Sequence, residues 1–382
     1  MGVLFHVLFL VFAILSFTYF IYIIIHLISW SRIPLSVTAG TTPKTKVTVI
    51  IAVRNEEENI GNCLNAIAAQ TYPAHLFEIV VVDDHSTDKT KERTEKALSQ
   101  IKVASKSISN RENSQGKKSA ISEGIKHSSG ELIVITDADC QSTSKWLSTI
   151  ESEYQKSGAY MLCGPVEIRC EPGLLGRFQT IELDGFSLLS GAGINIGVPL
   201  LCSGANIAYT RQLFNDVEGF KDIDHNPTGD DVLLMFKVHK KFPGKIAFLK
   251  SMDALVTTSG VASFKDFLLQ RIRWASKGLY SKNFANSFVS LLAFSSNFFS
   301  VAAILVIAIS GKLFPMLIFG LAVKILADFL LLLFAADFFN RKKLLWIFPV
   351  AELITMLYVS WVGIVSNFSS YSWKDRHYKR PR

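Results

Sequence analysis

The first 31 residues contain no aspartate, glutamate, lysine or arginine, and Arg32 is the first charged side chain. Such a run exceeds the roughly 20 apolar residues that a helix needs to cross a bilayer. A cleaved signal peptide would carry a basic start and a small-residue cleavage site, and the sequence shows neither. We therefore expect residues 4–29 to form a retained membrane helix.

Three more hydrophobic segments follow late in the sequence, at about 283–311, 313–336 and 345–367. Lys324 and Asp328 interrupt the second of these segments, and Glu352 is the only charge in the third. Because Lys324 and Asp328 are four residues apart, a helix places them on one face, where they can form an ion pair. Ionisable residues inside a membrane are also candidates for function, so a structural and a functional role both stay open.

The distribution of charge points to a membrane protein and away from a nucleic-acid partner. Charged residues make up 19% of the chain, below the roughly 25% usual for soluble domains. Residues 32–282 hold 30 lysines and arginines against 28 acidic residues, whereas residues 283–382 hold 10 against 4. The positive surplus therefore lies among the hydrophobic segments, where it is typical of an orientation signal.

Five cysteines are scattered through the central region, at Cys63, Cys140, Cys163, Cys170 and Cys202. Their number is odd and no two of them form a C-x-x-C pair, which argues against a disulfide framework and against a zinc site. Unpaired cysteines suit a reducing compartment. We expect them to be small buried side chains.

The central region, residues 32–282, alternates strand-like and helix-like segments. The expected strands are Val47–Ala52, Glu78–Val82 and Glu131–Thr136, and the expected helices are 56–70, 87–100 and 118–127. Short β-branched runs separated by helices are typical of an α/β domain with a Rossmann-like, mostly parallel sheet. Ligands of such sheets bind beyond the carboxyl ends of the strands.

Polar clusters follow each of these strands. They are Arg54-Asn55-Glu56, Asp83-Asp84 and Asp137-Ala138-Asp139. Because parallel strands end at one edge of a sheet, we expect the three clusters to converge on one crevice. Asp137 and Asp139 are hard oxygen ligands that suit Mg²⁺ or Mn²⁺ bridging a diphosphate.

Other motifs in the region are open to two interpretations. Asp83-Asp84 can contact a base or ribose, or can belong to a capped turn that opens a helix. The turn at Gly116-Lys117-Lys118 can place cations near a phosphate, or can carry two solvated lysines. The glycines of 191–197 have the spacing G-x-G-x-x-x-G in mid-chain, which does not fit a dinucleotide-binding fingerprint.

Seven motifs together resemble one known family. They are AVRNEEENI, VVVDDHSTD, QGKKSAISEGI, TDADC, SGAN, TGDD and QRIRW, in this order along the chain. In sequence and spacing they resemble the membrane-bound family 2 glycosyltransferases of the GT-A fold, in the cellulose-synthase-like and ceramide-glucosyltransferase-like branch. The resemblance covers roughly residues 46–280, and the flanking hydrophobic segments are also similar to that branch.

The resemblance implies a nucleotide pocket, with uridine as the expected base, lined by Arg54, Glu56, Asp83, Asp84 and Lys117. It implies that Asp137 contacts the ribose or the metal, and that Asp139 binds Mg²⁺ or Mn²⁺ on the sugar diphosphate.

Further along the chain, the resemblance implies that Asn206 faces the donor or acceptor sugar and that Asp231 is the general base. Gln270, Arg273 and Trp274 would close the site over the diphosphate and the acceptor. In one departure, Gly229-Asp230-Asp231 stands where many relatives carry Thr-Glu-Asp.

Asp230, Asp231 and Trp274 also have structural interpretations. Asp230 and Asp231 precede an apolar run, Val232–Phe236, and can simply cap a helix. Trp274 offers a flat apolar face to a sugar ring, but it can also anchor the chain at a membrane interface.

The expected domains are a membrane helix (1–31), a cytosolic GT-A domain with an interfacial helix near 262–282 (32–282), three hydrophobic membrane segments (283–370) and a basic tail (371–382). The expected function is inverting, metal-dependent transfer of a sugar from a nucleotide sugar, expected to be a UDP-sugar, to a hydroxyl of a lipid or glycan acceptor in the bilayer. A processive polysaccharide synthase and a non-catalytic membrane subunit are the alternatives. Few spans leave little material for a translocation channel, unless the protein oligomerises or has a partner subunit.

Nucleotide sugars are made in the cytosol, so we expect the catalytic domain to face it, from the inner (plasma) membrane of a bacterium. The loop at 340–343 would then lie inside, as the positive-inside tendency favours. With three C-terminal spans, however, the basic tail would lie outside. Either the tail breaks the tendency, or the segment with Pro349 and Glu352 lies in the interface or re-enters the membrane.

Overall fold

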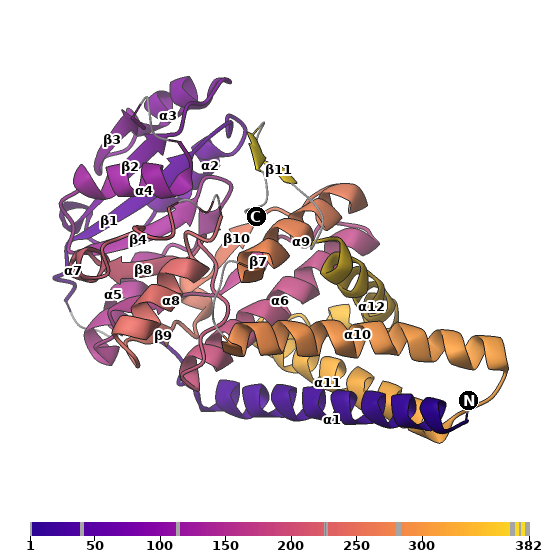
Figure 1. Cartoon of the computed structure of the whole chain (residues 1–382). Coiled ribbons are helices and arrows are strands. Elements are labelled where there is room, and N and C mark those ends of the chain that lie inside the picture. The colour runs from indigo at the N-terminus through magenta and orange to yellow at the C-terminus, as the bar shows by residue number, and fades with distance from the viewer. Residues whose placement is uncertain are drawn as a thin grey trace.

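The computed structural model describes residues 2–38, 42–111, 115–224, 226, 228–279, 284–366, 371–373 and 376–378. Its centre is a seven-stranded sheet, flanked at one side by long helices (Figure 1). The strands are β1 (Val47–Val53), β2 (Phe77–Asp83), β3 (Ala104–Ser109), β4 (Leu132–Asp137), β6 (Met161–Cys163), β8 (Ile207–Thr210) and β9 (Ile246–Phe248). They lie in the order β3-β2-β1-β4-β8-β6-β9, and β8 alone runs antiparallel to its neighbours.

Alternate residues of the strands supply two separate cores, one on each face of the sheet. On one face Ile50 and Val80 pack with the helix α4 (Lys117–Lys126), and on the other face Ile51 and Val81 pack with α2 (Ile60–Ala68) and α5 (Trp146–Ser157). Because both faces are covered, the strands need apolar residues at nearly every position. The observed sheet confirms the predicted α/β class.

The predicted strands and helices are present with shifted ends, and β3, β6, β8 and β9 of the sheet were not predicted. The helix expected at 56–70 begins only at Ile60, because Glu56, Glu57 and Glu58 belong to the turn that follows β1. The segment expected to be helical at 87–100 contains α3 (Thr90–Leu98). Strand β3 was missed because its sequence, ASKSIS, is polar, which an edge strand tolerates.

A second, small sheet joins β5 (Gln141–Ser142), β10 (Val256–Thr258) and β7 (Val166–Ile168). Next to it lies the long helix α6 (Leu174–Asn195), which contains the first glycines of the 191–197 motif. A Cβ on Gly191 would lie 2.8 Å from ring atoms of Trp30 and Phe248. This glycine therefore allows close helix packing. A packing role agrees with the expectation that the glycines of 191–197 do not bind a dinucleotide.

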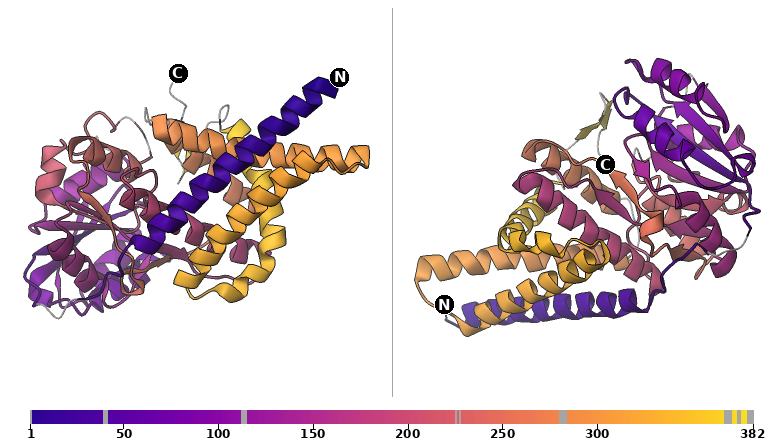
Figure 2. Two further views of the ribbon diagram at one scale, coloured as in Figure 1. Left: turned by 90° about the horizontal axis from the view of Figure 1, so that it is seen from below. Right: turned by 180° about the vertical axis from the view of Figure 1, so that it is seen from behind.

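Among the described residues, four helical stretches are long and apolar enough to cross a membrane: His6–Arg32, Phe284–Ser310, Pro315–Phe338 and Lys342–Val365. They correspond to α1 (Gly2–Arg32), α10 (Phe284–Ser310), α11 (Pro315–Phe338), and η3 (Lys342–Ile347) with α12 (Phe348–Val365). The first three extend away from the sheet, and the N-terminus lies at their far end (Figures 1 and 2).

The last helix, α12, is arranged differently from the other three. The short helix η3 before it packs against α6, and the hairpin after it, β11 (Tyr371–Trp373) with β12 (Arg376–Tyr378), contacts α9 (Phe264–Leu279). Both ends of α12 thus lie beside α6 and α9, which are not among the membrane-type helices. Half of the basic tail, residues 374–375 and 379–382, lies outside the described residues, as does the expected boundary at 282–283.

Candidate active site

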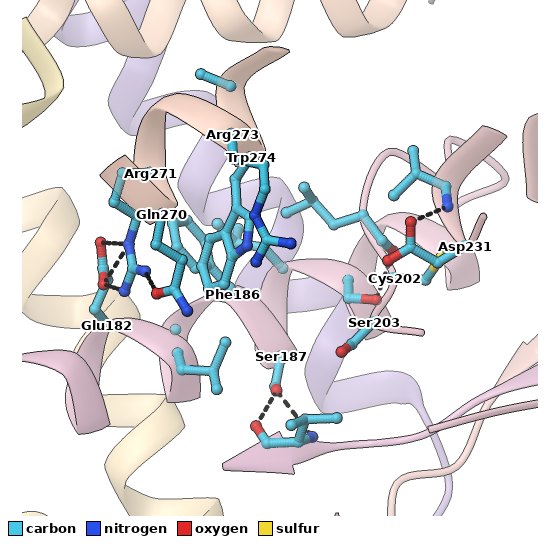
Figure 3. Close-up of a pocket in the computed structure, with 18 of the residues that line it drawn as sticks. Glu182, Phe186, Ser187, Cys202, Ser203, Asp231, Gln270, Arg271, Arg273 and Trp274 are labelled. Atoms are coloured by element: carbon cyan, nitrogen blue, oxygen red, sulfur yellow. Dashed lines mark hydrogen bonds and ion pairs between the residues drawn. The ribbon is translucent and has the colours of Figure 1, made fainter. Parts of the chain in front are cut away.

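A cavity of about 1320 Å³ opens at the carboxyl ends of β1, β2 and β4. The register of the sheet explains why, since Ala52 pairs with Asp137 and Val53 pairs with Asp83, so these strands end at the same level. The cavity continues past α6 and α9 to residues of α10, α11 and α12. Figure 3 shows its middle part, with Gln270, Arg273 and Trp274 facing the region of Asp231.

Asp137 and Asp139 lie together at the end of β4, as the sequence predicts. Ligand atoms of these two residues and of Cys140 all lie within 4.8 Å of one another. Burial, followed by the charges of Asp137 and Glu56, raises the pKa of Asp139. A divalent cation would relieve this crowding of carboxylates, so the donor set fits Mg²⁺ or Mn²⁺.

Lys117 links the metal-ligand candidates to the Gly229-Asp230-Asp231 turn. Its Nζ atom lies 2.6 Å from Oδ1 of Asp137 and 3.1 Å from Oδ2 of Asp230. Burial alone would lower the pKa of Lys117, but the carboxylates of Asp137 and Asp230 raise it well above its ordinary value. Lys117 is therefore a fixed cation in the cavity wall and not a solvated lysine.

The residues expected to form the nucleotide pocket mostly hold its loops together. Arg54 donates hydrogen bonds of 2.8 Å to the carbonyl oxygens of Asp84 and His85. The carboxylate of Asp84 accepts from the backbone N–H of Gly116 at 3.0 Å, so it fixes the turn that starts α4. Arg54, Asp84 and Glu56 also line the cavity.

Asp83 is placed differently from its neighbour. It is buried and does not line the cavity, and its Oδ2 atom accepts a hydrogen bond of 3.3 Å from the backbone N–H of Ser86. This bond is that of the capped turn, the alternative interpretation of the Asp83-Asp84 pair. The structure therefore does not support Asp83 as a residue of the cavity wall.

Asp230 and Asp231 lie in the cavity wall at the start of α8 (Val232–Lys241). Gly229 before them has a φ of +78°, a conformation that favours glycine. Asp231 accepts from the backbone N–H groups of Val232 at 2.7 Å and of Gly204 at 3.1 Å. Asp231 is thus a helix cap, as the structural interpretation held, and it still faces the cavity.

Asn206 does not face a ligand, contrary to expectation. Its side chain is fully buried, and its Nδ2 atom donates to the carbonyl oxygens of Pro165 and Ala254, both at 2.8 Å. Its Oδ1 atom accepts from the indole N–H of Trp146 at 2.9 Å. With these bonds Asn206 joins β8 to neighbouring loops, which corrects the expected sugar contact.

Helix α9 carries Gln270, Arg273 and Trp274 into the cavity wall, as expected. Arg271 of the same helix also lines the cavity, and it forms a buried ion pair with Glu182 of α6 (Figure 3). The guanidinium of Arg271 lies 4.1 Å from the ring centroid of Trp274 and donates to Gln270.

Trp274 is held inside the protein by this stacking and by an edge contact with Phe186, 6.3 Å between centroids. A position in the cavity wall favours the sugar-platform interpretation over a membrane anchor. Phe264 at the start of the same helix is 50% exposed and is the better candidate for an interfacial anchor.

Sequence reasoning missed the pairing of Arg271 with Glu182, and it left the role of Lys118 open. Glu182 and Asp184 were detectable as acidic residues within a largely apolar helical run, but their partners, Arg271 and Arg341, were not. Lys118 is buried and donates from Nζ to the carbonyl oxygens of Ile223, Asn226 and Thr228, so it supports the loop that leads into Asp230. The neighbouring lysines of α4 thus have separate roles.

The expected ion pair between Lys324 and Asp328 is present, with Nζ 2.8 Å from Oδ2. Two further residues join it: Glu352 pairs with Lys324, and the hydroxyl of Tyr19 donates to Asp328 at 2.5 Å. The network thus connects α1, α11 and α12.

The described cysteines are free, and Cys63 and Cys140 are buried under the carboxylates at the end of β4. Burial raises the pKa of both thiols. Cys63, Cys140 and Cys163 are the small buried side chains that the sequence predicts, whereas Cys170 is exposed and Cys202 is half-buried, contrary to that prediction. Cys140 adjoins the proposed metal ligands.

The model of one family, described as glycosyl transferase family 2, matches residues 48–217 of this chain. Over 193 residues the chain is 38% identical to the glycosyltransferase AglE of Haloferax volcanii, covering 49% of this chain and 59% of that protein. Over 241 residues it is 29% identical to the beta-monoglucosyldiacylglycerol synthase of Nostoc sp., covering 61% of this chain and 48% of that one. The chain therefore spans less than two thirds of these relatives.

The mannosyltransferase PcManGT from Pyrobaculum calidifontis, solved in complex with GDP-Man and Mn²⁺, has a similar structure. The TM-score is 0.66 at 17% sequence identity, and the match covers 95% of this chain and 98% of that one. At this identity the similarity shows the fold, which is GT-A, and it includes the flanking helices.

Proposed function

We propose that this chain transfers a sugar from a nucleotide-diphosphate sugar to a hydroxyl of a membrane-associated acceptor, a proposal supported by its match to glycosyl transferase family 2 and by its GT-A fold. One observation carries the proposal. A single cavity is lined both by Asp137 and Asp139 at the strand ends and by residues of the membrane-type helices α10, α11 and α12. A soluble donor and a lipid-borne acceptor can therefore meet in one chamber.

The charges of the cavity favour a divalent cation as a companion of the donor. Among the described residues that line it, nine are aspartate or glutamate and four are lysine or arginine. A diphosphate entering so acidic a space needs a cation beside it. We assign Asp139, with Asp137, as the ligands of Mg²⁺ or Mn²⁺, which when bound would neutralise charge on the departing diphosphate.

The remaining residues are assigned to binding and proton transfer. Arg54, Glu56 and Asp84 surround the nucleotide, with Lys117 near its phosphates, and uridine is the base that we propose. The proposed acceptor hydroxyl attacks the anomeric carbon while the bond from that carbon to the diphosphate oxygen breaks, which inverts the configuration.

Asp231 accepts the hydroxyl proton in this step. Asp230 shares Lys117 with Asp137 and so belongs to the diphosphate side of the cavity, which leaves Asp231 for the acceptor side. The N-terminus of α8 favours the ionised form of Asp231. Arg273 on α9 compensates the negative charge that grows on the leaving group, and Trp274 supports a sugar ring.

The contacts of the 340–343 loop support an orientation in the membrane. Arg341 forms ion pairs with Glu167 of β7 and with Asp184 of α6, and its Nη1 atom lies 3.1 Å from Oδ1 of Asp184. The loop therefore lies on the same side of the membrane-type helices as the catalytic domain. We propose that this side is the cytosol, where the positive-inside tendency places such a loop. We propose further that α12 re-enters, so that the tail also lies on this side.

A radiolabelled-donor assay tests the function. The purified protein is incubated with membrane lipids and nucleotide sugars in Mn²⁺ or Mg²⁺, and label is followed into the organic phase. We expect transfer that requires the cation and is lost in Asp139→Asn, whereas Asp253→Asn, at an exposed ion pair with Lys145, stays active.

Full transfer in excess chelator would refute the metal assignment. Absence of both transfer and donor hydrolysis with every nucleotide sugar would favour the non-catalytic alternative. A labelled product of many sugar units would favour the processive synthase over transfer of a single sugar.

A further inference from the structure

The membrane-level part of the cavity is polar, although apolar helices surround it. Five polar side chains from four helices line it: Tyr19, Asn297, Asp328, Glu352 and Thr355. Polar groups inside a bilayer are costly and are usually found where they contact a partner or a water-filled space. None of these five belongs to the proposed metal or nucleotide sites.

Among the described residues, this chamber offers hydrogen-bond acceptors but no accessible cation at the level of Asp328 and Glu352. Lys324 is fully buried and does not line the cavity, and its ammonium group is bound to Asp328 and Glu352. An anionic phosphate would therefore find no free counter-charge there, whereas a hydroxyl can donate a hydrogen bond to a carboxylate.

A second, independent feature indicates that a hydrogen-bond donor binds. Asn297 of α10 is 4% exposed, and its Nδ2 atom donates to the carbonyl oxygen of Ala293 at 2.8 Å. Its Oδ1 atom has no hydrogen-bond partner among the described residues. A buried acceptor of this kind is costly unless a partner is supplied, and the cavity that it lines gives a ligand access to it.

We propose that this chamber binds the head group of an uncharged, hydroxyl-bearing lipid, and that this lipid is the acceptor. The proposal rests on the proposed function and narrows it, because it selects neutral lipids over lipid phosphates. The head-group hydroxyls donate to Asn297, Asp328 and Glu352 while the acyl chains lie among the apolar side chains of α10 and α12. The same cavity leads from this chamber to Asp231.

An acceptor panel tests the proposal with the full-length protein in mixed micelles. The probes are diacylglycerol, monoglucosyl diacylglycerol and a polyprenyl phosphate, and donor hydrolysis by water is measured in parallel. We expect transfer to one or both neutral lipids, with the polyprenyl phosphate at least tenfold less efficient in kcat/KM.

Variants locate the binding site. Asn297→Ala and Glu352→Gln should raise the KM for the lipid at least tenfold and leave the donor KM and donor hydrolysis unchanged. Ser300→Ala is the matched control, because Ser300 lies one turn from Asn297, is buried, and does not line the cavity. Asn297→Ala leaves the ion network intact, so it remains informative if Glu352→Gln fails to fold.

Preference for the polyprenyl phosphate would overturn the proposal, and so would an Asn297→Ala protein with an unchanged lipid KM. Equal losses in donor hydrolysis and in lipid transfer would also overturn it, because they would indicate a structural role. An enzyme without any donor hydrolysis or transfer would instead refute the proposed function itself.

Discussion

Replacing Glu182 with glutamine should break the buried ion pair with Arg271 that joins helix α9 to α6. Arg271 is 3% exposed and Glu182 9%, and Nε of Arg271 lies 3.1 Å and 3.2 Å from the two carboxylate oxygens. Removing one charge of a buried pair costs about 3–5 kcal/mol. Because glutamine still accepts one hydrogen bond, we expect a loss near the lower end, about 3 kcal/mol.

The same change should also reduce activity, because Arg271 supports two residues of the cavity wall. Its guanidinium stacks on Trp274 and donates to Gln270, and both of these line the cavity. A displacement of about 1 Å in such groups can cost on the order of 10² in rate. We therefore expect a kcat lower by about that factor, with donor affinity retained.

Thermal unfolding in detergent and the radiolabelled-donor assay measure both effects. Glu218→Gln is the matched control, because Glu218 forms an exposed ion pair with Lys221 that should contribute little to stability. The double variant Glu182→Leu with Arg271→Met leaves no uncompensated charge, so it should unfold at a higher temperature than Glu182→Gln while kcat stays low. If Glu182→Gln has the same unfolding temperature and the same kcat as Glu218→Gln, the Arg271–Glu182 pair supports neither the stability of the protein nor the cavity wall.

Two further changes test the site and the orientation. Asp231→Asn should lower kcat at least about 100-fold with donor affinity nearly unchanged, since general-base help is worth typically 10²–10⁴-fold; normal turnover in Asp231→Asn, with a loss in Asp230→Asn instead, would move the base by one residue. A cysteine at Ser372, in a cysteine-free background, should react with an impermeant maleimide only after the cells are permeabilised, whereas a cysteine at Ser310 should react in intact cells. Labelling of position 372 in intact cells would show that α12 crosses the membrane.

The sequence allowed the arrangement of the sheet edge to be predicted, because local patterns determine it. Apolar β-branched runs predict buried parallel strands, and the polar residues directly after them must then share one edge. Hence Asp137, Asp139 and Asp84 lie where they were expected. Strand ends are predictable in this way because one short segment contains both the strand and its polar cluster.

The direction of single side chains could not be predicted in the same way. Asn206 was expected to face a sugar, but its amide satisfies carbonyl groups of two distant loops. Asp83 and Asp84 are adjacent, yet one lies in a capped turn and the other in the cavity wall. Such outcomes depend on which buried backbone groups need partners, and that is known only when the fold is complete.

Long-range ion pairs were the other part that the sequence did not reveal. The spacing of Lys324 and Asp328 predicts their pairing within one helix, but nothing local indicates that Glu352, 24 residues beyond Asp328, joins them. Arg271 and Glu182 are 89 positions apart and find each other only because α6 and α9 pack together.

These buried pairs explain how the catalytic and membrane parts can act together. Arg341, which immediately precedes η3, binds Glu167 and Asp184. Tyr358 of α12 donates to Glu182, the partner of Arg271 on α9. A lipid that displaces α12 would thus act on Glu182 and, through it, on the helix that carries Gln270, Arg273 and Trp274. A buried charge cannot lose its partner without a large cost in free energy. A shift of one partner should therefore move the other more strictly than a shift in apolar packing would. Occupation of the membrane-level chamber and closure of α9 over the donor should therefore be coupled, so that the sugar is transferred to lipid in preference to water.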